Sequence, residues 1–446
     1  MAVTDGRHLF LEGGAGVEIA AVRGTRDILP GESRLWAWVE EAARRTCARY
    51  HYEEIRTPIF ELAALFARGI GEVTDIVEKE MYTFVDRGGR ELALRPEGTA
   101  GVVRAVLEHK LYAGPLPVKL FYVGPMFRYE RPQAGRYRQF TQFGVEAFGS
   151  ADAALDAEII SLGISFLTEV GLKEWELRLN SIGCPVCRGP YRELLRSRLE
   201  PLRHELCVSC QQRLDRNPLR VLDCKEEGCR RLTEGIPPID EYLCPECRRH
   251  WESVQEHLNA LGIPFRRYPR LVRGLDYYTR TVFELVTIGL GSQDAVLGGG
   301  RYDGLAEMMG GPSVPAIGFA AGLDRLLLGL EAAGTLPEPG PEVDLYVARV
   351  GDVPQAQVLR LVTELRRQGL RVDMDFLGRS LKTQMKTADR LGAVFTLVVG
   401  EGEWERGEVL LRRMSDGSQE VLPREGLAEK VAERLAAAQA IARGEV

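Results

Sequence analysis

The segment Phe121–Ser150, FYVGPMFRYERPQAGRYRQFTQFGVEAFGS, is the stretch on which the prediction of the fold depends. Apolar runs at Lys119–Val123 and Phe143–Phe148 enclose a polar turn, and this pattern predicts two strands paired in antiparallel fashion. Guanidinium groups on the first strand and in the turn can hold phosphate oxygens in pairs. The arginines concerned are Arg128, Arg131, Arg136 and Arg138.

The residues of this hairpin allow two interpretations. Phe140 on the returning strand can stack on a base, and together with the arginines it predicts a nucleotide site. A solvated arginine-rich hairpin, with Glu130 and Glu146 as ion-pair partners, explains the same composition. The sequence contains no Gly-Lys-Ser/Thr phosphate loop, so a bound nucleotide must be held by another structural motif.

Three segments farther along the chain are further candidates for a ligand site. Each alone also has a structural explanation: a tyrosine pair on an amphipathic strand, a glycine-rich hairpin turn, or a buried strand–helix corner. The segments are Leu271–Glu284 (LVRGLDYYTRTVFE, with Arg273, Tyr277 and Tyr278), Gly298–Gly304 (GGGRYDG) and Ala316–Leu328 (AIGFAAGLDRLLL, with Arg325 early in its helix).

Between these segments, strands and helices mix without regular βαβ alternation, which predicts an α+β domain on an antiparallel sheet. Arg56–Phe60 is expected to begin a strand, and Gly98–His109 has helical spacing. Strands and helices alternate after residue 343, as in an α/β module. The predicted organisation is a lead-in over 1–20, the α+β domain over 21–183 and 263–334, an insertion over 184–262, a proline-dense linker over 335–342 and the α/β domain over 343–446.

Composition excludes several classes of protein. The chain has 446 residues, 45% hydrophobic and 27% charged, as in globular proteins with a substantial core. Its longest apolar run, Ala393–Val399, is far shorter than the ~18 residues of a membrane helix. The start, MAVTDGRHLF, lacks the pattern of a secretory signal, so we expect a cytoplasmic protein with no membrane partner. The net charge of −6 leaves any nucleic-acid binding to local basic patches.

Eight of the nine cysteines lie close together in the insertion. In a reducing compartment, clustered Cys-x-x-Cys spacing indicates a metal more often than disulfides, and two structural Cys₄ zinc sites fit the count. Three alternatives remain: one zinc site with free thiols, His204 or His250 as a substitute ligand, and eight unliganded cysteines in an insertion with little apolar core. The cysteines form the pairs Cys184 and Cys187, Cys207 and Cys210, Cys224 and Cys229, and Cys244 and Cys247.

Taken together, these segments resemble the class II aminoacyl-tRNA synthetases, and within that class the histidyl-tRNA synthetase family. The resemblance extends from Arg23–Pro30, RGTRDILP, to the C-terminal module. Arg56–Glu61, Phe127–Glu146 and Ala316–Leu328 are similar to the first, second and third motifs of the class. The stretches LVRGLDYYTRTVFE and GGGRYDGL are similar to the two signatures of the histidine family.

The resemblance implies a histidine–tRNA ligase that forms histidyl-adenylate from histidine and ATP and then transfers histidine to the 3′ end of tRNA(His). It places two catalytic cations, Arg128 and Arg273, on opposite sides of the reacting carboxylate and α-phosphate, where charge stabilisation is needed. The ATP-binding residues that it implies are Arg128, Glu130, Arg136, Phe140 and Arg325, with Phe140 on adenine and Glu130 as a candidate ligand of Mg²⁺.

Recognition of histidine requires groups that bind an α-ammonium and both imidazole nitrogens. The resemblance puts Glu97, Thr99 and Gln142 around the α-amino group and Glu146 and Tyr278 at the ring nitrogens. Taken alone, Glu97 is better explained as a strand-end or helix-cap carboxylate. The complete set of histidine-binding residues that the resemblance implies is Glu97, Thr99, Gln142, Glu146, Arg273, Tyr277, Tyr278 and Gly300.

The resemblance also implies a homodimer, with the first motif at its interface, and a C-terminal domain that binds the anticodon. Two alternatives come from related folds. One is a synthetase-like regulatory subunit of ATP phosphoribosyltransferase, which is a binding protein, and the other is a class II synthetase for threonine, proline or glycine. The Tyr277–Tyr278 signature argues against both, and residues 343–446 argue against the regulatory subunit.

Overall fold

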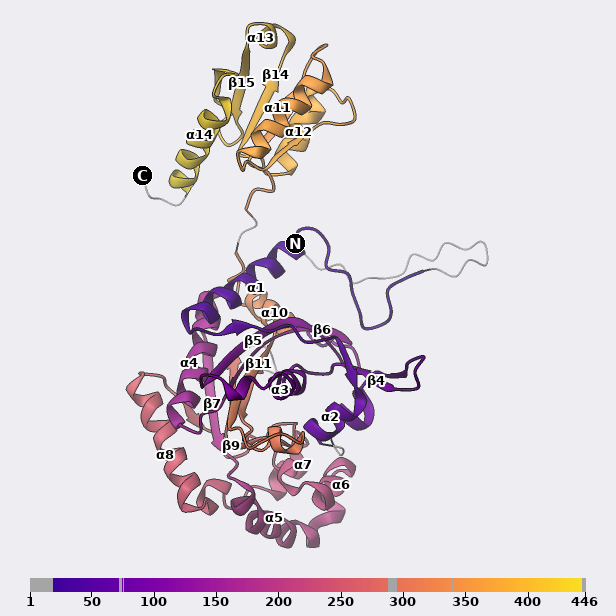
Figure 1. The fold of residues 1–446 in the computed structure, drawn as a ribbon, viewed down its shortest axis with the longest axis vertical. Helices are drawn as coiled ribbons and strands as arrows, with labels where there is room; N and C mark the ends of the chain where they lie inside the picture. Colours follow the sequence, from indigo (N-terminus) through magenta and orange to yellow (C-terminus); the bar gives the residue numbers. More distant parts are fainter. Residues whose placement is uncertain (1–18, 72–73, 75, 288–294, 338–339, 443–446) are drawn as a thin grey trace. The chain divides into compact units, whose positions relative to one another are not determined.

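The computed structural model describes residues 19–71, 74, 76–287, 295–337 and 340–442. The chain divides into two compact units, Met1–Pro337 and Glu338–Val446 (Figure 1). The expected lead-in over residues 1–20 lies almost wholly outside the described residues, as does the middle of the expected linker. Among the described residues, no helix is both long and apolar enough to cross a membrane.

The first unit is built on an eight-stranded sheet whose central strands are all antiparallel, which confirms the predicted α+β class. Its two edge strands add in parallel. In spatial order, the strands are β1 (Glu53–Glu54), β5 (Val118–Phe127), β6 (Gln139–Phe148), β11 (Ala316–Gly322), β10 (Ala295–Arg301), β9 (Thr279–Thr287), β7 (Trp175–Ser181) and β8 (Arg266–Arg267).

Alternation along the central strands sorts their side chains onto two faces. On β6, Phe143 and Val145 are fully buried in one apolar cluster, while Gln142 and Glu146 take the intervening positions on the opposite face. The same period puts Phe283 on the core side of β9. One face of the sheet therefore supplies a hydrophobic core, and the other carries polar side chains.

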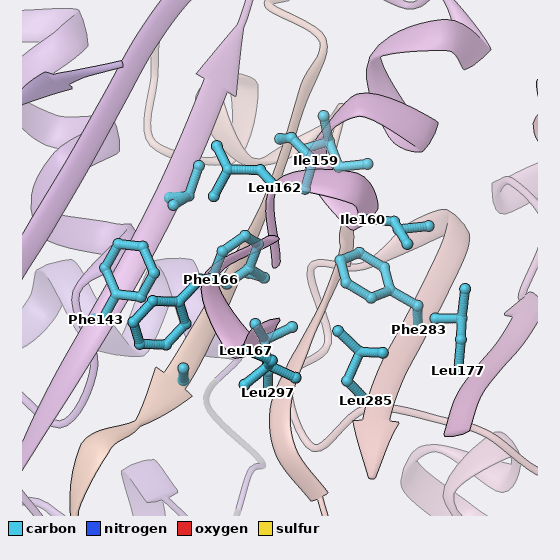
Figure 2. Close-up of a cluster of buried hydrophobic side chains, with 14 of the residues drawn as sticks. Phe143, Ile159, Ile160, Leu162, Phe166, Leu167, Leu177, Phe283, Leu285 and Leu297 are labelled. Atoms are coloured by element: carbon cyan, nitrogen blue, oxygen red, sulfur yellow. The ribbon is translucent and has the colours of Figure 1, made fainter. Parts of the chain in front are cut away.

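Helix α4 (Ala153–Glu169) covers the apolar face. Asp152 caps its N-terminus by accepting a hydrogen bond from the backbone N–H of Ala154 at 2.9 Å. Figure 2 shows Phe166 of this helix beside Phe143, and their ring centroids lie 4.8 Å apart in an edge-to-face arrangement. Two further helices complete this layer: α1 (Glu32–Arg49) and α8 (Pro245–Ala260).

The polar face is approached by a smaller layer. A three-stranded sheet has the order β2, β4, β3, and two helices follow its strands. Residues 56–59 lie outside any strand, so the strand predicted over Arg56–Phe60 is wrong: only Phe60 pairs, opposite Leu94. The elements are β2 (Phe60–Leu62), α2 (Ala63–Ile70), η1 (Ile76–Glu80), β3 (Thr83–Val85), β4 (Glu91–Leu94), α3 (Thr99–Glu108) and η2 (Leu111–Ala113).

The insertion is almost entirely helical, and its helices lie together below the sheet in Figure 1. Its apolar side chains, such as Tyr191 and Leu195, belong to one buried cluster with Tyr122, Val282 and Tyr302 of the main sheet and its loops. The alternative of an insertion with little apolar core is therefore wrong. The elements before α8 are α5 (Pro185–Leu199), η3 (Glu200–Glu205), α6 (Val208–Arg216), η4 (Pro218–Val221), α7 (Glu227–Leu232) and η5 (Ile239–Tyr242).

The chain returns from the insertion to β9 and β10, and two short helices complete the unit: α9 (Leu305–Met308) and α10 (Leu323–Ala332). The second unit has its own sheet, in the order β13, β12, β14, β15, β16, with parallel pairing among the first three strands and antiparallel pairing beyond. It matches the predicted α/β class. Its elements are β12 (Leu345–Arg349), α11 (Gln355–Arg367), β13 (Val372–Met374), α12 (Leu381–Arg390), β14 (Phe395–Val399), α13 (Glu401–Glu405), β15 (Glu408–Arg413), β16 (Gln419–Pro423) and α14 (Leu427–Ala442).

Candidate active site

A cavity of about 620 Å³ opens on the polar face of the main sheet. Arg128 and Arg273, which are far apart in the sequence, both line it. Side chains that are polar or charged dominate its wall, as expected for a site that binds a phosphorylated ligand. The sequence-predicted residues that line it are Arg128, Glu130, Arg136, Phe140, Gln142, Arg273 and Arg325.

The β5–β6 hairpin supplies one side of the cavity. Arg128 donates from Nε to the backbone oxygen of Pro96 at 2.9 Å, and its guanidinium carbon lies 5.3 Å from the ring centroid of Phe140. Glu130 sits between two cations, 3.7 Å from Arg128 and 3.1 Å from Arg136. The interpretation as a solvated hairpin with Glu130 as an ion-pair partner is thus correct in part, but the hairpin faces a cavity.

The segment before β9 supplies another part of the cavity wall. Arg273 forms an ion pair with Glu284, and Glu284 pairs in register with Gly298 on the next strand. A Cβ atom on Gly298 would lie 2.5 Å from Nη1 of Arg273, so this glycine makes room for the guanidinium. The close approach explains physically why a residue without a side chain occupies this position of GGGRYDG.

Arg325 projects from the first turn of α10 into the same cavity and donates to the backbone oxygen of Ala295 at 3.0 Å. Burial and the neighbouring Arg136 lower the pKa of Arg325 from its ordinary value. A pKa lowered by other cations indicates a positive potential, and this potential would attract a polyphosphate.

A second group of predicted residues is almost fully buried and does not line the cavity. The hydroxyl of Thr99 donates to Glu146 at 2.6 Å, and the hydroxyl of Tyr302 donates to the other oxygen of the same carboxylate. Burial raises the pKa of Glu146 to about 8. Glu97 accepts hydrogen bonds from the backbone N–H groups of Thr99 and Ala100 at 2.6 and 2.9 Å, which is the helix-cap role foreseen for it alone.

Two tyrosines join the buried group to Arg273. The rings of Tyr277 and Tyr278 are 4.7 Å apart, and Tyr277 lies 5.5 Å from Tyr302. A Cβ atom on Gly300 would come within 3.0 Å of the Tyr278 ring, so Gly300 keeps the backbone close to that ring. The residues of this group that do not line the cavity are Glu97, Thr99, Glu146, Tyr277, Tyr278 and Gly300.

Nine buried side-chain polar atoms of the described residues have no hydrogen-bond partner, and two of them, Oε1 of Gln142 and Nε of Arg273, belong to predicted site residues. Both residues line the cavity. Burying an unpaired donor or acceptor costs about 1–3 kcal/mol, so such atoms commonly mark a place where a ligand binds. The acceptor suits an ammonium group, and the donor suits a carboxylate.

The sequence prediction missed several cavity residues. Asp223, Lys225 and Arg230 come from the insertion and flank cysteines, which drew attention to the sulfur atoms alone. Glu284 and Asp324 stand inside the quoted motifs and were not assigned a role. Asp324 accepts from the backbone N–H of Thr141 at 2.8 Å and so connects α10 to β6.

The eight cysteines of the insertion form two separate clusters, and in each cluster all sulfur atoms lie within 4.8 Å of one another. Either cluster could hold a metal ion. His250 belongs to neither, since its Nε2 lies 3.1 Å from Asp156, and His204 is exposed beside Glu205. We call the two groups the proximal cluster (Cys184, Cys187, Cys244 and Cys247) and the distal cluster (Cys207, Cys210, Cys224 and Cys229).

The antiparallel sheet, the arginine-lined cavity between its second-motif hairpin and α10, and the matching motifs define a class II aminoacyl-tRNA synthetase fold. Sequence comparison gives the particular family. The profile described as "Histidyl-tRNA synthetase" matches residues 24–187 and 239–326, and the one described as "Anticodon binding domain" matches residues 344–434. The chain belongs to the histidyl-tRNA synthetase family, as the motifs predicted.

Relatives and solved structures agree with this assignment. The chain is 53% identical to "Histidine--tRNA ligase" of Halothermothrix orenii over 90% of its length and 96% of the relative, and 56% identical to that of Desulforudis audaxviator over 90% and 95%. Its structure is similar to apo S. aureus histidyl-tRNA synthetase, with a TM-score of 0.79 and 41% identity over 93% and 99% of the two chains.

A more distant solved structure shares the fold alone. It is described as "an ATP phosphoribosyltransferase regulatory subunit/histidyl-tRNA synthetase" from Bacillus halodurans, with 21% identity and a TM-score of 0.60 over 86% and 98% of the two chains. The two alternatives drawn from related folds thus have no support comparable to that of the relatives above 50% identity.

Proposed function

We propose that this protein is a histidine–tRNA ligase, which activates histidine with ATP and transfers it to the 3′ end of tRNA(His). One observation supports the proposal: the four predicted arginines, which come from three separate segments, line one cavity, and Gln142 of the cavity wall shares a face of β6 with the buried Glu146. The relatives that cover nine-tenths of the chain carry this activity in their names.

In the first step, the histidine carboxylate attacks the α-phosphorus of ATP and pyrophosphate leaves. Two anions must meet, so the reaction needs cations on both and an orientation that brings them into line. Arg128 and Arg273 both line the cavity, and on opposite sides of the reacting groups their charges would lie on the two partners and stabilise the transition state. Arg136 and Arg325 would hold the β- and γ-phosphates, and the ring of Phe140 would stack on adenine.

Histidine would be held at the inner end of the cavity. The unpaired Oε1 of Gln142 would accept from its α-ammonium, and Glu97 and Thr99 would add negative and hydroxyl character nearby. Glu146 and Tyr278 would bind the two imidazole nitrogens. An amino acid without ring nitrogens would leave these buried groups unpaired, and such sites reject analogues by about 10⁴-fold or more.

Mg²⁺ would share the charge of the phosphates when bound. The donor set fits, because Mg²⁺ takes carboxylate oxygens together with phosphate oxygens, and Glu130 presents a carboxylate to the cavity beside Arg128 and Arg136. Glu130 is therefore the residue that would hold it. Zn²⁺ is the structural ion that we propose for the cysteine clusters, and the reducing cytoplasm, where thiols stay available to a metal, is the proposed location.

In the second step, a terminal hydroxyl of tRNA attacks the mixed anhydride and AMP leaves. The second unit would bind the anticodon of tRNA(His), with few basic contacts and with stacking on unpaired bases, because residues 343–446 carry as many acidic as basic side chains.

A homodimer is also part of the proposal. The three-stranded sheet and the residue before it expose several large apolar side chains, a feature that is typical of interaction surfaces. We name these side chains the β2–β3 surface, and its residues are Ile59, Phe60, Leu62 and Phe84. The surface includes the end of the first motif, which the family resemblance associates with the dimer interface.

Pyrophosphate exchange with each of the twenty amino acids tests the proposal. Exchange that depends on histidine alone is expected. Exchange with threonine, proline or glycine instead would assign another class II synthetase, and no exchange with any amino acid would favour the binding protein.

A further inference from the structure

The two cysteine clusters have sulfur geometry that suits tetrahedral metal coordination. The Sγ atoms of Cys184 and Cys187 are 3.7 Å apart, and those of Cys207 and Cys224 are 3.9 Å apart. A zinc ion with Zn–S bonds of about 2.3 Å sets sulfur–sulfur edges of about 3.8 Å in a tetrahedron. Disulfides require sulfur atoms at roughly 2.05 Å, so the described cysteines are not paired in that way.

The helices of the insertion start at these cysteines. Cys184, Cys207 and Cys244 are the N-cap residues of α5, α6 and α8, and in each case the next cysteine lies in the first turn. A helix N-terminus presents free backbone N–H groups that can donate to sulfur. The arrangement therefore holds both sulfur atoms of three of the four cysteine pairs at the start of a helix.

Backbone N–H groups also point at the sulfur atoms. The N–H of Cys244 donates to Sγ of Cys187 at 3.1 Å, and the N–H of Cys207 donates to Sγ of Cys229 at 3.2 Å. Each bond links two pairs of one cluster. Hydrogen bonds of this kind hold metal ligands in place and offset part of the negative charge of four thiolates.

The two cysteine clusters are nested in the sequence, one inside the other. The proximal cluster joins the two ends of the insertion, whereas the distal cluster lies wholly between them. The histidyl-tRNA synthetase profile leaves out residues 188–238, which contain every cysteine of the distal cluster. The distal cluster is thus a feature of this chain's insertion, outside the matched part of the profile.

The proximal cluster lies beside the predicted histidine pocket. Gly183, next to Cys184, accepts from the hydroxyl of Thr279 at 3.2 Å and from the N–H of Arg280 at 3.0 Å. Arg188, next to Cys187, donates to the backbone oxygen of Tyr278 at 2.9 Å. An ion in this cluster would tie the base of the insertion to the segment that carries Tyr278.

The distal cluster forms part of the cavity wall itself. Cys224 lines the cavity with its neighbours Leu222, Asp223 and Lys225, and Arg230, which follows Cys229, lines it too. The wall segment has no strand of its own, and its backbone is held by turns such as the Cys224 N–H to Val221 bond at 3.1 Å. A metal ion in the distal cluster would hold this segment of the cavity wall in place.

We propose that the chain binds two zinc ions, one in each cysteine cluster, and that the distal ion positions Asp223, Lys225 and Arg230 as a wall of the ATP cavity. The assignment of the cavity to ATP rests on the proposed function, whereas the presence of two ions does not. The distal cysteines are positioning residues, since they act on the ligand through their neighbours.

The first test is metal content. Inductively coupled plasma mass spectrometry on the purified chain is expected to find about two zinc ions per chain. The variant Cys207→Ser/Cys210→Ser should keep the proximal ion and contain about one, and Cys184→Ser/Cys187→Ser should likewise lose one. Cys47→Ala, which removes a buried cysteine outside both clusters, is the matched control and should retain both ions. Stoichiometric iron, or one zinc or none in the unmodified chain, would overturn the two-site proposal.

The second test is the coupling to the cavity. Cys207→Ser/Cys210→Ser should raise the KM for ATP about tenfold or more while changing kcat and the KM for histidine much less. An unchanged KM for ATP would overturn the wall role. Because this variant can fail to fold, zinc release from the unmodified protein to a chromophoric chelator provides an independent measurement: MgATP should slow one of two release phases. Equal rates with and without MgATP would contradict the coupling.

The two kinds of failure are distinguishable. Zinc content is measured without any substrate. Its result is therefore independent of the result of histidine-dependent pyrophosphate exchange. Two zinc ions in a chain without that exchange would leave the metal sites in place and reject the proposed function.

Discussion

The hydroxyl of Thr99, in the first turn of α3, donates a 2.6 Å hydrogen bond to Oε1 of Glu146 on β6. The hydroxyl of Tyr302 donates to the other oxygen, so both oxygens of a carboxylate at 1% exposure are engaged by neutral donors. Burial raises the pKa of Glu146 to about 8, above its ordinary value of 4.5. The folded chain therefore binds more protons than the unfolded chain between these values, and this contribution to the free energy of unfolding falls as pH rises through the window.

The first prediction follows from this pKa. With its pKa raised to about 8, Glu146 is mostly protonated at pH 7 without ligand, and because an ionised carboxylate is the stronger acceptor for an imidazole N–H, histidine binding should release a proton. Histidine affinity should then rise with pH between about 7 and 8, above the range where free imidazole titrates. Calorimetry of histidine binding in two buffers of different ionisation enthalpy measures the proton directly.

The titratable and hydrogen-bonding groups that interact with Glu146 include Glu97, Thr99, Tyr122, Tyr277, Tyr278 and Tyr302. Glu146→Gln keeps the shape and removes the titration, so its binding enthalpy should not depend on the buffer. A binding enthalpy of the unmodified protein that is the same in both buffers would contradict the proton release.

The second prediction concerns Gly298. Gly298→Ala places a methyl group 2.5 Å from Arg273, and the guanidinium must move. Misplacing a group that acts on the transition state costs about 10²-fold, so histidine-dependent pyrophosphate exchange should fall by about that factor. Gly304→Ala is the matched control, because a Cβ atom there meets nothing within 4 Å. Equal exchange rates in the two variants would remove Arg273 from its proposed place.

The third prediction compares two arginines of one hairpin. Arg128 lines the cavity, whereas Arg131 is exposed and does not. Arg128→Gln should lower kcat for exchange by about 10²–10³-fold, since it removes a donor aimed at developing charge. Arg131→Gln should change kcat by less than about twofold. Steady-state kinetics of both variants decides the matter, and a larger loss at Arg131 would refute the assignment.

The fourth prediction concerns the homodimer. Phe60→Asp puts a charge on the β2–β3 surface, where burial against a partner would leave it unpaired and cost several kcal/mol. Sedimentation should show a dimer for the unmodified chain and a monomer for this variant. Val421→Asp, at an equally exposed apolar position in the second unit, should remain dimeric. A monomeric unmodified chain would reject the dimer.

The fifth prediction concerns stability. Arg301 and Asp156 form a fully buried ion pair, and His250 and Asp303 extend it. Arg301→Met leaves the carboxylate of Asp156 without its main counter-charge, which typically costs about 3–5 kcal/mol. Denaturant unfolding followed by circular dichroism should show this loss. The double variant Asp156→Asn/Arg301→Met should recover part of it, and a double variant as unstable as the sum of both single changes would indicate no coupling.

Much of the fold was readable from local patterns. The alternation in QFTQFGVEAF predicts one apolar and one polar face, and this period places Phe143 and Glu146 on opposite sides of β6. The motifs and their order predicted the family, which the comparisons confirm. The strand expected at Arg56–Phe60 failed because no partner strand lies opposite residues 56–59, and a strand needs a partner as well as a pattern.

The candidate active site was predicted only in part. That part came from family resemblance, whereas the fold came from local patterns. Family resemblance pointed to residues such as Arg128 and Arg273, and both line one cavity, although their roles stay predictions. Asp223 and Lys225 were missed, since nothing in LDCKEE distinguishes a cavity wall from a metal-binding turn. Their place depends on how α6, η4 and α7 fold back on the sheet.

By itself, the sequence determined the strand faces, the arginine-rich hairpin, the glycine positions and the eight cysteines, because spacing along the chain encodes what lies on one face of one element. Only the tertiary structure decided which cysteines meet. Cys187 joins Cys244 across 57 residues and not Cys207, the next cysteine in the chain. Such choices depend on the path of the backbone between elements, and local spacing does not contain that path.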